Sequence, residues 1–506
     1  MRRFIKLEQN ASGSSRLTDK SRERGVALVA ALFALMLLSA IGLGLMYATN
    51  MDTDVNFNYR DAVRAGYAAR SGVEEVRDRL RTANANPITP PTALPGAASG
   101  SVIYVINSNG GTAVQPWSST NVYRDPELCH EKFTYGGTAL SDSGTGLPCD
   151  ASALPSGSTW YATTASTAPN VGTSSALDYR WVRLNIKGNA SAAPFYVNGV
   201  DDNHTTIVCW DPANRRQILL PAGQANCDVA GLRTVYMVTS LAVTPNGSRR
   251  LTQAEVAKFS LPPIPSALTL LGPNPTYGAP TSNNFVVQGT DHANSLCSNI
   301  TGDPQPGVGV SNATADATFT ASIPINRLDH YTGSGAWPDV QNVSSDVVGL
   351  GTVADLQVLT QLVRDNANII QNGRTSAVIP TLGTAANPMV TFIDGDATID
   401  GNISGGGLLF VTGSLNISGN FNYNGLIMVV GRGMMTVGGG GGAQIYGGVF
   451  LAKILDDSYN VLPSLGNPTL DWSGGGGNGI YYDTCYISRA TGGTAYQMLS
   501  FREFPY

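Results

Sequence analysis

An uncharged apolar run, residues 26–51, is the feature that most constrains this chain. About 20 apolar residues suffice for a helix to cross a bilayer, so the run predicts a transmembrane helix. The preceding residues 1–25 hold seven Lys or Arg against three acidic residues, a net charge of +4. Positive flanks stay on the cytoplasmic side of a membrane, so we expect Gly25 inside and everything after Met51 outside.

The helical pattern continues beyond the apolar run. A series of apolar or small residues follows at spacings that alternate between four and three, which places them on one stripe of a helix. The stripe consists of Val55, Tyr59, Ala62, Gly66, Ala69, Val73, Val76 and Leu80. A helix unbroken from Val26 to about Thr82 would measure roughly 85 Å. The sequence therefore predicts that one helix leaves a membrane and continues as an amphipathic helix.

Residues 24–29 (RGVALV) resemble the site cut by prepilin peptidase, and the segment up to Leu80 resembles the N-terminal helix of PilX-type minor pilins of type IV pilus systems. The resemblance implies cleavage between Gly25 and Val26, followed by methylation of Val26. Major pilins carry a glutamate at the fifth mature position, where this chain has Ala30. Tip pseudopilins of the related secretion systems also lack that glutamate. The departure implies a minor subunit located at a filament tip.

The resemblance also implies locations and partners. Before assembly the chain would be a single-pass inner-membrane protein, N-terminus in and C-terminus out, and afterwards part of a cell-surface pilus, or fimbrium. Its partners would be other pilins, prepilin peptidase, the inner-membrane assembly platform and a surface ligand for cell adhesion. Residues 471–506 resemble the C-terminus of large PilX-like pilus assembly proteins, while the similarity elsewhere is loose.

A lone signal-anchor helix on an exported protein is the simpler alternative for the N-terminal segment. An ordinary secretory signal has a shorter apolar stretch and a small-residue cleavage site after it. Here the glycine stands directly before the run, at Gly25. Small residues at the centre of the later stripe, Ala62, Gly66 and Ala69, permit close approach of another element. Both details favour the pilin-like interpretation.

Composition indicates an exported, β-rich protein. Charged residues make up 13% of the chain, and the formal net charge of −5 becomes −9 without residues 1–25. Such a chain is a poor electrostatic match for nucleic acid, so no nucleic-acid partner is expected. All six cysteines follow the apolar run, which favours disulfides. Spacing favours the pairs Cys129–Cys149, Cys209–Cys227 and Cys297–Cys485 among the fifteen pairings that six cysteines permit.

Strand and turn signals divide the remaining chain. Residues 84–100 read as a Pro-rich linker, and residues 101–262 carry alternating strands at 179–187 and 233–243. Pro245-Asn246-Gly247 then predicts a hairpin with a strand over 249–259. The apolar face of this antiparallel sheet could bury the helix stripe. A second linker is expected over 263–283, followed by a head domain over 284–506.

An 18-residue repeat marks the head domain. Phe392, Phe410 and Met428 are 18 residues apart, and the glycines three positions after each keep the same interval. Repeating coils of this kind stack because one coil cannot bury its own apolar face. We expect a short right-handed parallel β-helix over 389–454, with the glycine run 438–442 lengthening the last turn and a helix before it over 353–370. A glycine-rich sandwich is the alternative.

Catalytic motifs are absent from the sequence: it contains no G-x-S-x-G, H-E-x-x-H or Walker-type pattern. Parallel β-helices also host carbohydrate-active enzymes, for which Asp394, Asp396 and Asp400 are the candidate residues. The same carboxylates could hold Ca²⁺. Their more ordinary interpretation is as turn residues beside glycines, and no cofactor or catalytic residue is assigned.

The expected fold class is α+β. A long N-terminal pilin-like helix would pack on an antiparallel sheet and be followed by a β-rich C-terminal domain with a short parallel β-helix. The expected function is that of a non-enzymatic minor pilin-like structural subunit involved in pilus assembly, located at the tip with an adhesive head. A membrane-anchored carbohydrate-active enzyme with a β-helix catalytic domain is the alternative.

Overall fold

The computed structural model describes most of the chain beyond residue 21. It excludes residues 82–83, 96–99, 109–112, 119, 129–133, 136–137, 140–160, 168–178, 190–196, 198–205, 229–231, 281, 300, 439–441, 473–477 and 505–506. The basic leader up to residue 21 and the expected Cys129–Cys149 pair therefore lie outside the described residues.

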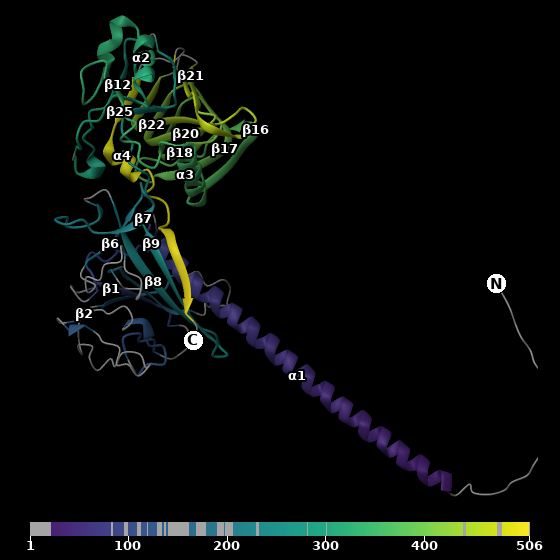
Figure 1. Cartoon of the computed structure of the whole chain (residues 1–506). Helices are drawn as coiled ribbons and strands as arrows, with labels where there is room; N and C mark the ends of the chain where they lie inside the picture. The colour runs from purple at the N-terminus through teal and green to yellow at the C-terminus, as the bar shows by residue number, and fades with distance from the viewer. Residues whose placement is uncertain are drawn as a thin grey trace, which may run out of the picture. The chain divides into compact units, whose positions relative to one another are not determined.

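A single continuous helix, α1 (Arg22–Arg79), begins the described chain (Figure 1). Its 58 residues correspond to about 87 Å, and Gly42 and Gly44 do not interrupt it. Among the described residues it is the one helix that is long and apolar enough to cross a membrane. The chain divides into two compact units, residues 1–64 and 65–506, so α1 contributes to both.

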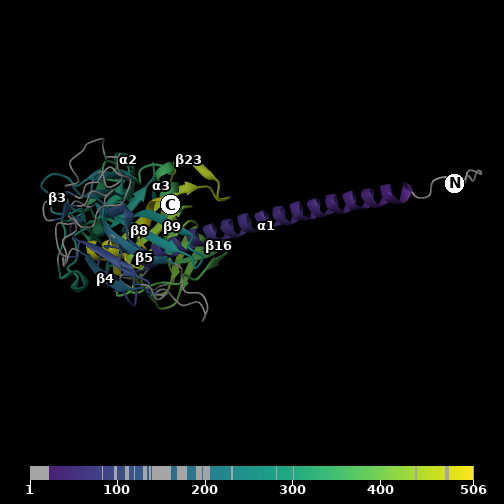
Figure 2. The same ribbon diagram turned by 90° about the horizontal axis from the view of Figure 1, so that it is seen from below.

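An antiparallel sheet forms the first part of the second unit. Its strand order is β26-β9-β8-β5-β1-β4, and every neighbouring pair is antiparallel except β1 and β4 (Figure 2). A hairpin of β6 (Val208–Asp211) and β7 (Arg216–Leu219) pairs with β8. The main strands are β1 (Val102–Ile106), β4 (Tyr161–Ala165), β5 (Tyr179–Ile186), β8 (Arg233–Val243), β9 (Arg249–Ala257) and β26 (Gln497–Phe504).

The predicted hairpin joins β8 to β9. The amide of Ser248 donates to the Thr244 hydroxyl at 3.1 Å, and the Gly247 amide donates to the Thr244 carbonyl at 3.0 Å. Gly247 has a φ of 90°, a conformation that glycine adopts without steric cost. The Asn-Gly turn thus fixes the register of the two longest strands of this sheet.

The last part of α1, from Ala65, packs on this sheet. Ala69, Val73, Val76 and Leu80 are buried with Tyr179, Val182 and Leu184 of β5 and with side chains of β8 and β9. The closest approach is at Gly72, where an added Cβ would lie 2.6 Å from the Ser240 hydroxyl and 2.7 Å from a methyl of Val182. At Gly66, on the predicted stripe, a Cβ would meet nothing within 4 Å.

A curled parallel sheet makes up the C-terminal region (Figure 1). The 18-residue interval is its register: Phe392 pairs with Phe410, and Phe410 pairs with Met428. Between β20 and β22 the interval grows to 22 residues, as Met428 pairs with Phe450, and the glycine run lies in that longer connection. The strands are β16 (Ile369–Val378), β17 (Met389–Asp400), β18 (Ile403–Val411), β19 (Ser414–Ser418), β20 (Phe421–Gly431), β21 (Met434–Gly438) and β22 (Ala443–Leu455).

Glycines make the bends of this sheet. β17 pairs with β18 before Gly395 and with β19 after it, so the strand turns from one side of the sheet to the next at that residue. Gly395, Gly407 and Gly425 have φ values of 125°, 115° and 150°. A Cβ on Gly425 would lie 2.0 Å from the Gly407 carbonyl oxygen, so stacked bends leave room only for glycine.

The expected linker at 263–283 is wrong in part. β10 (Leu268–Leu271) lies in it and pairs with β22, and β11 (Thr276–Gly278) pairs with β24 (Thr469–Asp471). The last strand, β26, returns to β9 in the antiparallel sheet, so residues 284–506 are not a separate sheet. Edge strands expose unpaired backbone groups, and pairing distant segments onto them satisfies those groups.

Other segments extend the parallel sheet: β12 (Phe285–Gln288), β13 (Val308–Val310), β14 (Tyr331–Thr332), β15 (Val340–Asn342), β23 (Val461–Gly466) and β25 (Asn478–Tyr482). Short helices α2 (Ala313–Ser322) and α4 (Thr484–Arg489) accompany them, and two short strands, β2 (Thr134–Tyr135) and β3 (Thr138–Ala139), pair only with each other.

The helix expected over 353–370 is α3 (Val353–Asp365), which ends earlier because Asn366 caps it and Ile369 begins β16. The Thr352 hydroxyl accepts from the Asp355 amide at its start. Its apolar face, Leu356, Leu359 and Val363, is buried in the same cluster as Phe392 and Phe410 of the parallel sheet. α3 therefore covers one side of that sheet.

Two disulfides join described cysteines. Cys209 bonds to Cys227 across 18 residues, and Cys297 bonds to Cys485 across 188 residues. These are two of the three pairs that the spacing favours. The second ties the loop after β12 to α4, so it closes a long segment of the β-rich region on itself.

Candidate functional site

The apolar surface of α1 is the first candidate site. Within the first unit, Leu28, Phe33 and Leu37 are 66%, 68% and 63% exposed, and the exposure continues through Val55 and Tyr59. A helix that is apolar all round is stable only inside a membrane or among other apolar surfaces. This surface therefore needs lipid or protein around it.

The predicted processing residues lie at the start of this surface. Gly25 and Val26 are within α1, and Ala30 follows among exposed apolar residues. Of the predicted stripe, Ala69, Val73, Val76 and Leu80 are buried on the sheet, Ala62 and Gly66 are half-buried, and Val55 and Tyr59 are exposed. The stripe thus contacts the sheet only over its second half.

A polar cluster fixes the end of α1 to the sheet. Glu75 accepts hydrogen bonds from the Ser166 hydroxyl at 2.9 Å, the Thr167 amide at 2.7 Å and the Tyr179 hydroxyl. Arg79 donates to the Ala165 carbonyl at 2.9 Å. Burial, together with the bond to Glu75, raises the pKa of Tyr179 above its ordinary value. The hydroxyl of Tyr179 therefore stays protonated and donates to Glu75 at neutral pH.

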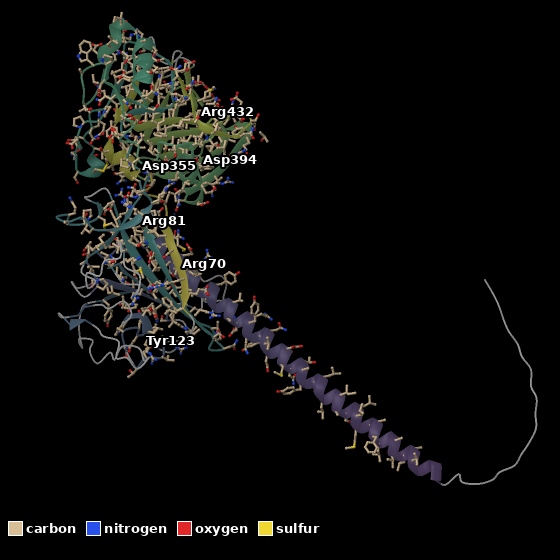
Figure 3. All side chains as sticks on the ribbon, in the orientation of Figure 1. Arg70, Arg81, Tyr123, Asp355, Asp394 and Arg432 are labelled. Atoms are coloured by element: carbon tan, nitrogen blue, oxygen red, sulfur yellow. A yellow bond between two sulfur atoms is a disulfide. The ribbon has the colours of Figure 1, made fainter. Side chains whose placement is uncertain are left out.

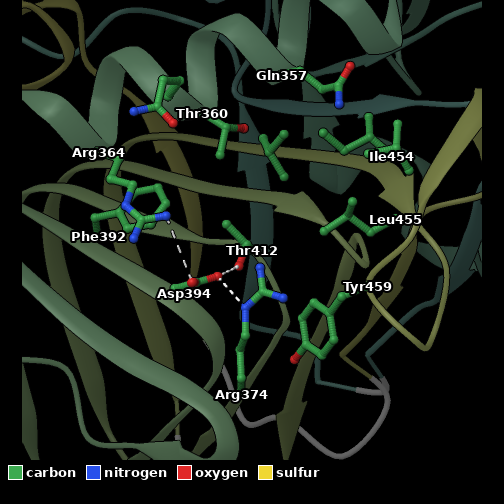
Figure 4. A pocket seen from close by; sticks show the side chains of 13 residues that line it. Gln357, Thr360, Arg364, Arg374, Phe392, Asp394, Thr412, Ile454, Leu455 and Tyr459 are labelled. Carbon is green, nitrogen blue, oxygen red and sulfur yellow. Dashed lines mark hydrogen bonds and ion pairs between the residues drawn. The ribbon is translucent and has the colours of Figure 1, made fainter.

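A groove beside α3 is the second candidate site, with a volume of about 230 Å³ (Figure 4). Its floor is the parallel sheet, α3 forms one wall, and the β22–β23 hairpin forms another. Figure 3 shows Asp394 and Arg432 in this part of the molecule. The lining consists of Gln357, Thr360, Gln361, Arg364, Arg374, Phe392, Asp394, Thr412, Val430, Ile454, Leu455, Tyr459 and Val461.

Asp394 is the central polar residue of the groove. Its carboxylate accepts from Arg374 Nε at 2.8 Å and from the Thr412 hydroxyl at 3.3 Å, and Arg364 Nη1 lies 4.0 Å away. The residue stands directly before the bend at Gly395, whose amide donates to Thr412 Oγ1 at 2.9 Å. The 18-residue register is what brings Thr412 beside Asp394.

Tyr459 enters the groove from the β22–β23 turn. It has a φ of 63°, a left-handed conformation that is uncommon for a tyrosine. The Asp456 carboxylate holds the turn by accepting from the amides of Ser458 and Asn460 at 2.8 and 2.9 Å. The guanidinium of Arg374 lies 4.7 Å from the Tyr459 ring centroid. Burial and the nearby Asp396 carboxylate raise the pKa of Tyr459.

The three aspartates named from the sequence have different partners. Asp394 faces the groove, Asp396 accepts from the Ser414 amide at 2.7 Å and pairs with Arg432 at 3.4 Å, and Asp400 accepts from the Ser418 hydroxyl. In the part of the chain that the structure describes, no group of three or more His, Cys, Asp or Glu side chains is placed to hold a metal ion. The calcium alternative gains no support from this arrangement.

No family model, no curated protein and no solved structure matches the chain. The site must therefore be judged on its own residues. Sequence reasoning missed Gly72, Arg374 and Tyr459. Gly72 offered a signal, as a glycine beside the apolar stripe, but Arg374 and Tyr459 lie 20 and 65 residues from Asp394 and carry no local motif.

Proposed function

We propose that this chain is a minor pilin-like structural subunit of a type IV pilus or a related filament. The observation that carries the proposal is the division of one continuous helix: its first part exposes apolar side chains, and its last part is fixed to a sheet of the same chain. The exposed part first lies in the inner membrane and later packs among the helices of neighbouring subunits. The curled sheet, interpreted as a short β-helix, belongs to the displayed head.

N-terminal sequencing of the membrane-extracted protein tests the processing step. Cells with prepilin peptidase should yield a chain that begins at methylated Val26, and cells without it should retain the leader. Gly25→Leu should block cleavage, whereas Gly42→Leu, the same change inside the apolar run, should not. A mature chain that begins elsewhere would contradict the proposal, as would purified filaments that lack the polypeptide.

Ala30 supports the minor and tip-located character of the subunit. Without a carboxylate at this position, the subunit leaves no unpaired charge in lipid when nothing assembles beyond it. Ala30→Glu should raise the number of copies per filament, measured by quantitative mass spectrometry of sheared filaments. Ala31→Glu, one residue further, is the control and should not raise it. An unchanged copy number in Ala30→Glu would contradict the tip assignment.

A membrane-anchored carbohydrate-active enzyme is the second candidate, and the groove around Asp394 is the observation that favours it. It has less support because Asp394 and Asp396 are engaged by arginines and Asp400 by a serine hydroxyl. Replacing the three aspartates with asparagine separates the proposals. Loss of a glycan-cleaving activity with normal piliation would support the enzyme.

A further inference from the structure

We propose that the groove beside α3 binds one neutral hexopyranose ring of a glycan. The proposal goes beyond the role of the helix and does not depend on it, because every residue involved lies in the second unit. It rests on the size of the groove, the division of its lining and the balance of its charges.

The groove has the size of a small ligand. Its volume of about 230 Å³ lies below the roughly 300 to 1,000 Å³ that is typical of sites for drug-sized molecules. A single sugar ring is therefore a better match than an extended peptide or a nucleotide.

The lining has an apolar side and a polar rim. Phe392 and Val430 from the sheet and Ile454, Leu455 and Val461 from β22 and β23 supply apolar surface. Arg374, Asp394 and Gln357 supply donors and acceptors from other directions (Figure 4). A pyranose ring has the matching division, since its C–H groups are apolar and its hydroxyls each donate and accept hydrogen bonds.

The polar groups are held in place and reachable. Arg374 uses Nε on Asp394, and its side chain is 46% exposed, so its terminal nitrogens can donate to a ligand. Stacking of Arg374 at 4.7 Å from the Tyr459 ring fixes the plane of the guanidinium. Tyr459 is therefore a positioning residue, and its left-handed backbone is the strained feature that its turn maintains.

Charges around the groove balance, which favours a neutral ligand. Arg364 and Arg374 face Asp394, and behind Tyr459 the guanidinium of Arg432 lies 3.4 Å from Asp396 and 3.5 Å from Asp457. Three guanidinium groups thus stand beside three carboxylates. A phosphate or a polyanion would gain little net attraction, whereas adjacent sugar hydroxyls can donate to a carboxylate and accept from a guanidinium.

Saturation-transfer NMR on the full chain tests the proposal. The protein should be kept in a detergent without a sugar headgroup, because maltoside or glucoside micelles would compete. The probes are the methyl glycosides of glucose, galactose, mannose and N-acetylglucosamine, with glucuronic acid as the charged comparison. We expect signal transfer to at least one neutral glycoside, and weaker transfer to glucuronic acid.

Two variants and one control locate the binding. Arg374→Ala and Asp394→Asn should each weaken binding about tenfold or more, the loss expected for a hydrogen bond to a charged group. Arg216→Ala, an exposed arginine on β7, should bind as the wild type does. Thermal unfolding of each variant checks that it is folded, and Thr412→Val gives a third substitution of nearly constant shape.

Three results would overturn the proposal. The first is no transfer to any neutral glycoside, and the second is transfer that Arg374→Ala and Asp394→Asn both retain. The third is tighter binding of glucuronic acid than of every neutral sugar, which would make the groove an anion site. Because the measurement involves no filament, its failure would leave the pilin-like proposal untouched, and a failed processing experiment would leave the groove untouched.

Discussion

The two ends of α1 are built from similar residues and lie in opposite surroundings. Leu37 in the first part is 63% exposed, whereas Val76 near the end is fully buried. Both regions are rich in alanine, valine, leucine and glycine. The comparison teaches that apolar character specifies a need for burial but does not specify the partner, since lipid, another subunit and a sheet of the same chain all satisfy it.

The second part of α1 differs in having features that fit one partner. Gly72 allows the helix backbone to approach β5 and β8, and Glu75 accepts hydrogen bonds from three groups of the sheet region. The first part offers apolar side chains alone over residues 26–51. A surface with no directional polar contacts can exchange one apolar environment for another at little cost.

A buried charge should produce the largest contrast between the two parts. Val76→Asp places a carboxylate in the helix–sheet core and should lower the free energy of unfolding by about 3 kcal/mol or more. Leu38→Asp should change that free energy by less than about 0.5 kcal/mol. It should instead impair membrane insertion, at a cost of about 2.5 to 3.5 kcal/mol. Urea titration in detergent and membrane fractionation measure the two effects. Equal unfolding effects would contradict the comparison.

The close approach at Gly72 gives the next largest effect. Gly72→Ala adds a methyl group within 2.7 Å of Val182, and overpacking of this kind costs about 1 to 3 kcal/mol. The gain in helix propensity, about 1 kcal/mol, offsets part of this cost. We expect a net loss of about 1 to 2 kcal/mol in the urea titration. An unchanged or raised stability would show that the helix can move away from the sheet.

Alkaline pH should weaken the helix–sheet contact through its tyrosines. The pKa of Tyr179 is raised in the folded chain, so its contribution is complete below the ordinary tyrosine pKa of about 10 and is lost as the pH rises above that value. Each such tyrosine adds at most about 1.4 kcal/mol per pH unit to the decline.

Tyr179→Phe isolates this contribution. It should cost about 1 kcal/mol at pH 8, because the bond to Glu75 is lost, and should reduce the decline in stability between pH 10 and 11. Burial also raises the pKa of Tyr236, and it raises the pKa of Tyr496 to about 12, so part of the decline should remain in the variant. Urea titrations at several pH values measure the slope. The same slope in both proteins would exclude Tyr179 as its source.

The smallest effect is expected at Gly66, which serves as the partner of Gly72. An added methyl at Gly66 meets nothing within 4 Å, so Gly66→Ala should stabilise the helix by up to about 1 kcal/mol. Opposite signs at two glycines six residues apart would locate the close contact. A loss at Gly66 would place the contact one and a half turns earlier than the structure does.

Regular patterns in the sequence were predictable because they are local. The Asn-Gly turn between β8 and β9 and the 18-residue register of the parallel sheet both follow from spacing alone. A finer signal was present and missed: glycines recur every six residues at 395, 401, 407, 413, 419, 425 and 431, and six of these seven have positive φ. That interval marks the bends of each coil.

Long-range pairings were not predictable in the same way. β10 pairs with β22 from 178 residues away in sequence, and β26 closes on β9 although it follows the whole parallel sheet. Neither strand has a pattern that names its partner. The groove is similar: Asp394 was a candidate from its position before a glycine, but Arg364, Arg374 and Tyr459 reach it only through the stacking of coils.

The sequence by itself determined that a long helix begins the chain, that it carries apolar surface along its length, and that an 18-residue period stacks the later strands. These properties follow from backbone geometry and from the periodicity of apolar residues, which act over a few turns or one coil. Only the tertiary structure decided where the helix stops being covered by its own chain and which distant side chains share the groove. Those outcomes depend on contacts between segments far apart in sequence, whose free energy no local pattern contains.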